Sequence, residues 1–247
     1  MTGGLAGAVA AEWTKLWTVR TAYVCLVAGA VLMGVFTFYY GAIARINDHP
    51  VQPVGNAPVA AATLVQFVVV VLAMTAVTSE YATTSVRATL LWVPVRHRVQ
   101  LAKALVTAVV AVAAGVLLGV LGTAVAWASF EGRATFDRTT VVGQVLLLGC
   151  YLALVAVLTA GVSFALRAPA GVLTVLFLLL YGVPTMLVGL GGEVLLTVND
   201  YLPHSAGTHA MLADEAPYPP PVGFLIVAAW AAVGHLTGRQ VLRRRDA

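Results

Sequence analysis

Long apolar stretches alternate with short polar segments along this chain, and almost no charged residue interrupts them. A helix that crosses the roughly 30 Å hydrocarbon core of a bilayer needs about 20 apolar residues, and six stretches meet this requirement. Membrane-spanning strands would be about ten residues long and would alternate in polarity, which these stretches do not. The pattern predicts an all-α polytopic membrane protein with six transmembrane helices, at about residues 21–44, 58–78, 104–127, 140–166, 170–190 and 222–238.

A shorter amphipathic segment, residues 8–20, precedes the first predicted span. Its apolar side chains Val9, Trp13, Leu16 and Trp17 recur at helical spacing, which predicts a helix lying in the membrane interface. Trp13, Leu16 and Trp17 are its expected anchors, because tryptophan combines an apolar ring with an N–H that reaches water or headgroups. The alternative, an aromatic anchor with no mechanical role, remains open.

The composition agrees with this pattern and excludes an ordinary soluble domain. Hydrophobic residues make up 60% of the chain and charged residues only 10%, with a mean hydropathy of +0.93. So little polar surface requires lipid as the solvent. The first stretch is too long for a secretory signal, so it is expected to stay in the protein as a span.

The distribution of basic residues orients the spans. Eleven of the 14 Lys and Arg residues fall on one side of the predicted spans and three on the other. The positive-inside rule then predicts that both termini are cytoplasmic. The formal net charge of +4 is explained by this topology and by contact with anionic lipids, so no nucleic-acid partner is required.

The segment between the second and third spans is short but patterned. If residues 80–91 are helical, Glu80, Thr84 and Arg87 lie on one face, and Pro94 ends the helix before Arg96. Such a helix could dock on a cytoplasmic partner. Charge placement alone favours the plainer interpretation, a solvated loop whose charges only enforce topology.

Two groups of residues resemble the ABC-2 type permeases of bacterial ABC transporters, most closely the small actinobacterial members with six spans. The first is Glu12-Trp13-Thr14-Lys15-Leu16 with Thr18-Val19-Arg20; the second is Ser79-Glu80-Tyr81 with Arg87, Thr89, Leu90, Pro94, Arg96 and Lys103. Thr84-Ser85 departs from the Gly-Thr that relatives commonly carry, which favours a more regular helix here.

The resemblance implies a role for both cytoplasmic segments. The interfacial helix and a coupling helix between spans two and three would contact a separate ATP-binding subunit, and Glu80, Thr84, Arg87 and Arg96 would carry the coupling. A second permease, either another copy or a related chain, would complete the complex.

The sequence contains no G-x-x-x-x-G-K-[ST] phosphate loop, so this chain is not expected to be an enzyme or to hold a cofactor. ATP and Mg would belong to the partner subunit. The expected activity is ATP-driven export of a hydrophobic or amphipathic solute. A non-transporting membrane scaffold or assembly factor is the alternative, and a secondary carrier is disfavoured because no charge lies in the central parts of the spans.

Other candidate sites carry weaker patterns. His204 and His209 lie near acidic residues, but their spacing matches no strong metal-ligand motif and the surrounding prolines favour a polar external loop. Cys25 and Cys150 lie within predicted spans and are expected to be reduced, buried thiols.

Small residues and a proline predict two packing features. Ala111, Gly115, Gly119 and Gly122 share one face of the third span, where another helix of the same chain can approach closely. Pro184 predicts a kink or break in the fifth span. The resemblance to ABC-2 type permeases implies that residues 193–197 re-enter the membrane in part.

Overall fold

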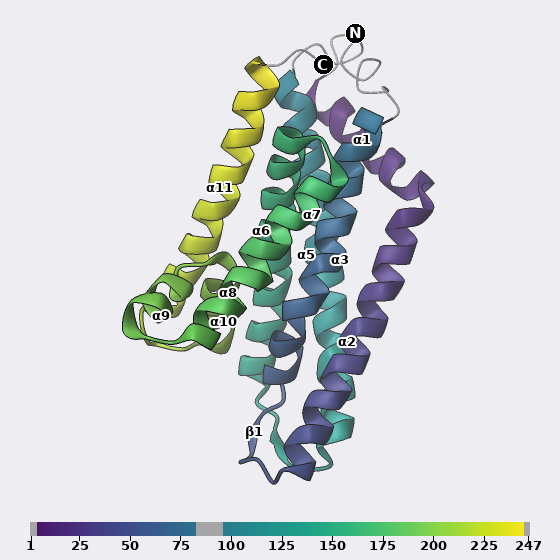
Figure 1. Cartoon of the computed structure of the whole chain (residues 1–247). Helices are drawn as coiled ribbons and strands as arrows, with labels where there is room; N and C mark the ends of the chain where they lie inside the picture. The colour runs from purple at the N-terminus through teal and green to yellow at the C-terminus, as the bar shows by residue number, and fades with distance from the viewer. Residues whose placement is uncertain (1–3, 83–95, 245–247) are drawn as a thin grey trace.

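A computed structural model describes residues 4–82 and 96–244, and Figure 1 shows an elongated helical bundle. The chain begins with α1 (Leu5–Thr18), which lies across one end of the bundle. Val19 is extended, with φ −99° and ψ 131°, and so separates α1 from the first long helix. The predicted amphipathic segment is therefore a separate helix joined to span one by an elbow.

Within the described residues, six helices are long and apolar enough to cross a membrane, as the hydrophobic pattern predicts, and the chain is a multi-pass membrane protein. Five of them are α2 (Arg20–Ile46), α3 (Asn56–Ala82), α5 (Arg96–Phe130), α6 (Arg138–Leu166) and α11 (Pro220–Arg244). The third begins eight residues before its predicted range and ends three residues after it, and the sixth begins two residues before and ends six after. Polar and charged end residues extend a helix without adding to the apolar signal by which spans are recognised.

The start of α1 and the end of α11 lie at the same end of the bundle, which we call the terminal end (Figure 1). The opposite end carries two short strands, β1 (Gln52–Pro53) and β2 (Ala134–Thr135), which pair in parallel. The predicted coupling helix begins within α3, and its remaining residues, including Thr84 and Arg87, lie outside the described ranges.

The fifth span is interrupted, as Pro184 predicts. It consists of α7 (Pro169–Phe177), a π-helical turn η1 (Leu178–Gly182) and α8 (Val183–Leu190). Proline lacks an N–H and leaves the carbonyl four residues earlier, that of Leu180, without its usual α-helical donor. The irregular turn therefore lies just before the proline.

The prediction of a polar loop around His204 and His209 was wrong, because both residues lie in a helix. Gly191 and Gly192 have positive φ and end α8, after which the chain forms α9 (Glu193–Asp200) and α10 (Pro203–Leu212). Proline is well tolerated at the first helical position, so Pro203 begins α10 instead of preventing it. The buried face of α10 then joins the main apolar core through Ala206 and Met211.

Small residues allow the helices of the bundle to pack backbone against backbone. A Cβ added at Gly115 on α5 would lie 2.7 Å from Gly149 Cα on α6, which confirms the predicted close approach within one chain. On another face of α6, a Cβ at Gly161 would lie 2.3 Å from the carbonyl of Gly234 on α11. Through these two contacts α6 packs closely against both α5 and α11, and it therefore lies at the centre of the bundle.

Candidate functional site

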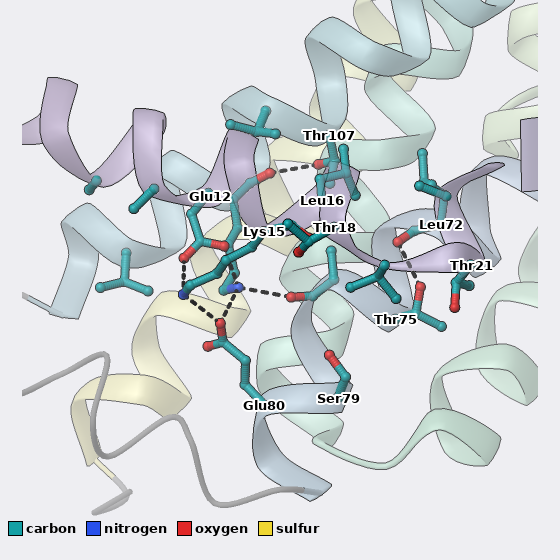
Figure 2. Close-up of a pocket in the computed structure, with 18 residues that line it drawn as sticks. Glu12, Lys15, Leu16, Thr18, Thr21, Leu72, Thr75, Ser79, Glu80 and Thr107 are labelled. Atoms are coloured by element: carbon teal, nitrogen blue, oxygen red, sulfur yellow. Dashed lines mark hydrogen bonds and ion pairs between the residues drawn. The ribbon is translucent and has the colours of Figure 1, made fainter.

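Four charged side chains meet at the terminal end of the bundle: Glu12 and Lys15 from α1, Glu80 from α3 and Lys103 from α5 (Figure 2). Lys15 and Lys103 are the only lysines in the chain. Glu12 and Lys15 are three residues apart, so both point from the same face of α1. Glu80 lies in the last turn of α3, and Lys103 lies about two turns into α5.

The four groups form a closed ring of alternating charge, which we call the ion ring. Lys15 Nζ donates to Glu12 Oε1 at 2.7 Å and to Glu80 Oε1 at 2.8 Å. Lys103 Nζ donates to Glu12 Oε2 at 2.6 Å and to Glu80 Oε1 at 3.0 Å. Each cation therefore touches both anions, and the formal charge of the ring is zero.

Lys103 is the most deeply buried member, with a side chain only 2% exposed. Its third donor reaches the backbone carbonyl of Ala76 at 2.8 Å, so all three ammonium protons have acceptors. Burial of an ion is costly unless it is paired and fully hydrogen bonded. The position of Lys103 therefore depends on Glu12 and Glu80, which come from two other helices.

Lys15 occupies the outer side of the ring and is 44% exposed. Burial by itself would lower the pKa of Lys15, but hydrogen bonds and charge attraction from Glu12 and Glu80 outweigh this effect and raise it above its ordinary value. Lys15 is thus a cation throughout the physiological pH range. It also lies in the last turn of α1, where positive charge is favoured by the helix dipole.

A pocket of about 600 Å³ adjoins the ion ring and is lined by α1, α2, α3 and α5 (Figure 2). Most of its walls are apolar or small, including Leu16, Leu72 and Val106. The hydroxyls of Thr75 and Thr107 bond to carbonyls of their own helices, at 2.8 Å in each case. The site thus combines a neutral, hydrogen-bonded charge cluster with an apolar cavity.

The predicted site residues are only partly brought together. Glu80 is part of the ion ring, whereas Arg96 is the first residue of α5. Thr84 and Arg87 lie outside the described residues. Of the predicted anchors, Trp13 is exposed, Trp17 is half-buried against it with ring centroids 5.8 Å apart, and Leu16 is buried in an apolar cluster with Leu72 and Val106.

Sequence reasoning did not identify Glu12, Lys15 and Lys103 as partners of Glu80. One signal was available: the only two lysines of the chain lie on the predicted cytoplasmic side, as do Glu12 and Glu80. The pairing itself could not be read from spacing, since Glu12 and Lys103 are 91 positions apart.

A second buried polar cluster, also missed, joins α10 to the bundle. Tyr151 OH donates to Gln66 Oε1 and lies 3.2 Å from His204 Nδ1, while His204 Nε2 lies 3.2 Å from the Thr63 hydroxyl. Since tyrosine has one proton to donate, its oxygen accepts from Nδ1–H, and the neutral Nε2 accepts from Thr63. Gln66 Nε2 completes the circle by donating to the Thr63 carbonyl at 2.9 Å.

Burial lowers the pKa of His204 from its ordinary 6.5 to about 4, so the ring is neutral at physiological pH.

His209 lies between Asp200 and Asp214, with nitrogen-to-oxygen distances of 3.5 and 3.6 Å. Within residues 4–82 and 96–244, no group of three or more His, Cys, Asp or Glu side chains is placed to hold a metal ion.

No protein-family model matches the chain, and no similar protein is found among curated proteins. The resemblance to ABC-2 type permeases therefore rests on the sequence of two segments alone, residues 12–20 and residues 79–103.

Proposed function

We propose that this chain is the membrane-spanning subunit of an ABC-2 type exporter, which moves a hydrophobic or amphipathic solute across the bacterial cytoplasmic membrane. ATP and Mg are bound by a separate subunit, and a second permease completes the complex. The observation that carries the proposal is the ion ring, since it connects α1 to the two helices that enclose residues 83–95.

The geometry suits transmission of force. Glu80 is three residues before the segment 83–95, and Lys103 is eight residues after it. A displacement of that segment acts on the end of α3 and on the start of α5. The ion ring couples each of these helix ends to α1 through charged hydrogen bonds of 2.6 to 3.0 Å. Charge-assisted hydrogen bonds in a poorly hydrated site are strong and directional, so the three helix ends move together.

This arrangement refines the roles expected from the resemblance. Glu80 acts inside the permease, as a link between α3, α5 and α1. Direct contact with the ATP-binding subunit is left to Thr84, Arg87 and Arg96. The apolar interior, formed mainly by Val, Leu and Ala, suits an apolar or amphipathic solute.

The proposal is tested by purifying the tagged chain from the membranes of its native host in mild detergent. We expect an ATPase containing a phosphate loop to co-purify, in equal amounts with the permease. Arg87→Glu reverses a charge at the proposed contact and should reduce co-purification by more than about tenfold. Arg243→Glu, which reverses an exposed charge at the end of α11, is the matched control and should leave it unchanged.

Transport provides the second arm of the test. Cells that express the complex should lose efflux of amphipathic dyes when ATP is depleted, and should keep it when the proton gradient is collapsed with ATP maintained. Purification of the chain without any ATPase, together with efflux that survives ATP depletion, would overturn the proposal in favour of a scaffold or a secondary carrier.

A further inference from the structure

The pocket beside the ion ring lies beneath the elbow between α1 and α2. Its walls come from α1, the first residues of α2, the last turns of α3 and the first turns of α5. Figure 1 shows the beginning of α2 standing apart from α3 at the terminal end, whereas the two helices approach each other further along. We call this pocket between membrane-spanning helices the wedge.

The wedge extends from the level of the charges into the apolar part of the bundle. Leu72 and Glu80 both line it and are eight residues apart on α3, which corresponds to about 12 Å along the helix axis. Between these levels the walls are formed by side chains such as Ala22, Ala76 and Val106. An apolar cavity at this depth is poorly suited to water, since water there would find few polar partners.

The size of the wedge fits a ligand. Its volume of about 600 Å³ lies within the range of roughly 300–1,000 Å³ that is typical of small-molecule sites. A flexible hydrocarbon chain fills a narrow apolar space between helices, and its removal from contact with water is favourable along its whole length. The depth and the walls therefore favour an acyl chain.

The mouth of the wedge favours negative charge. The ion ring, which includes half-exposed Lys15, is neutral overall, whereas Arg20 is exposed and lies in the chain between Val19 and Thr21, which both line the pocket. The first turn of α2 carries no acidic residue, and its N-cap, Val19, provides no side-chain hydrogen bond to the first amides. The first turn of α2, which includes Arg20 and the wall residue Thr21, therefore lies at the mouth of the pocket without an acidic side chain of its own.

We propose that this wedge binds one anionic phospholipid from the leaflet at the terminal end. One acyl chain lies along Leu72, Ala76 and Val106, and the phosphate lies near Lys15, Arg20 and the first turn of α2. The lipid holds the elbow and supports the position of α1 over the bundle. This site requires neither an ATP-binding subunit nor transport, so it stands independently of the proposed function.

The test is native mass spectrometry of the purified chain in detergent, after addition of phosphatidylglycerol or of phosphatidylcholine with identical acyl chains. We expect one phosphatidylglycerol molecule to be retained per chain, in preference to phosphatidylcholine. Ala76→Phe fills the wedge and should abolish this retention. Ala124→Phe places the same ring in an apolar groove between α5 and α6, outside the wedge, and should leave it unchanged.

A second pair of variants tests the headgroup without altering the apolar walls. Arg20→Gln should weaken phosphatidylglycerol retention by about fivefold, the effect of one cation near an anionic lipid, and should leave phosphatidylcholine unaffected. Arg243→Gln removes an exposed charge elsewhere at the terminal end and should have no effect. Since Arg20 is exposed, its variant remains informative even if Ala76→Phe does not fold.

Three results would overturn the proposal. Equal retention of the two lipids by the unaltered chain would remove the role of charge. Unchanged phosphatidylglycerol retention in a folded Ala76→Phe protein would place the lipid elsewhere. Displacement of the lipid by glycerol 3-phosphate at equal concentration would show that the phosphate alone is recognised and that the acyl chain is not.

Discussion

Lys103 Nζ donates a 2.6 Å hydrogen bond to Glu12 Oε2, although 91 positions separate the two residues in the chain. The bond joins the helix that lies across the bundle to a helix that spans it. The side chains of Lys103 and Glu12 are only 2% and 8% exposed, so water cannot take the place of either partner if the other is removed. The attachment of α1 therefore depends on this pair.

Replacement of Lys103 tests this dependence. Lys103→Met keeps the length and the apolar stem of the side chain but leaves Glu12 and Glu80 with Lys15 as their shared cation. We expect a loss of about 3–5 kcal/mol in the free energy of unfolding, the usual cost of removing one partner of a buried ion pair. Thermal unfolding of the purified protein, followed by circular dichroism, measures this loss.

The double variant Lys103→Met with Glu80→Gln is the internal control. It removes one charge of each sign and leaves the Glu12–Lys15 pair in place, so a large part of the lost stability should return. Additive destabilisation by the two changes would contradict a coupled ring.

The contact between α6 and α11 makes a second prediction. Gly161→Ala adds a Cβ that would lie 2.3 Å from the Gly234 backbone, so the helices must separate, at a cost of about 1–3 kcal/mol. Gly143→Ala is the matched control on α6, because nothing lies within 4 Å of its added Cβ. We expect the control to be neutral or stabilising by up to about 1 kcal/mol, from the higher helix propensity of alanine. Equal melting temperatures for the two variants would rule out backbone contact at Gly161.

The hydroxyl of Tyr151 connects Gln66 on α3 with His204 on α10, and it is fully buried. Tyr151→Phe leaves Gln66 Oε1 without its donor and His204 Nδ1–H without its acceptor. A loss of about 1–3 kcal/mol is expected for each buried group left unpaired. Protease cleavage within residues 191–220 should become faster in this variant, because α10 loses a link to the bundle; an unchanged cleavage rate would exclude such a link.

Acid should loosen the same region. His204 has a folded-state pKa of about 4, below its ordinary 6.5, so the unfolded chain binds a proton more readily than the folded chain. Stability contributed by neutral His204 is therefore present above pH 6.5 and falls as the pH drops from 6.5 toward 4. Melting temperatures measured across this interval should decrease, and His204→Gln should reduce the slope. His49→Gln, an exposed position at the opposite end, should preserve the slope of the unaltered protein.

The spans, the separate amphipathic helix and the break at Pro184 were all predictable from the sequence. Each depends on neighbouring residues: the length of an apolar run, the spacing of Trp13 and Trp17, or the missing N–H of a proline. The small residues of the third span likewise predicted a close contact, because a missing side chain permits approach by any suitable helix.

The tertiary structure decided which helices and which polar groups meet. Nothing in their spacing links Glu12 to Lys103, or Gln66 to Tyr151 and His204, since these residues come from different helices. The polar composition around His204 suggested a loop, but burial of Ala206 and Met211 against the bundle stabilises a helix there. An apolar run is enough to predict that a helix enters the membrane, because it depends only on neighbouring residues. Which charged side chains pair with one another depends on how the helices pack.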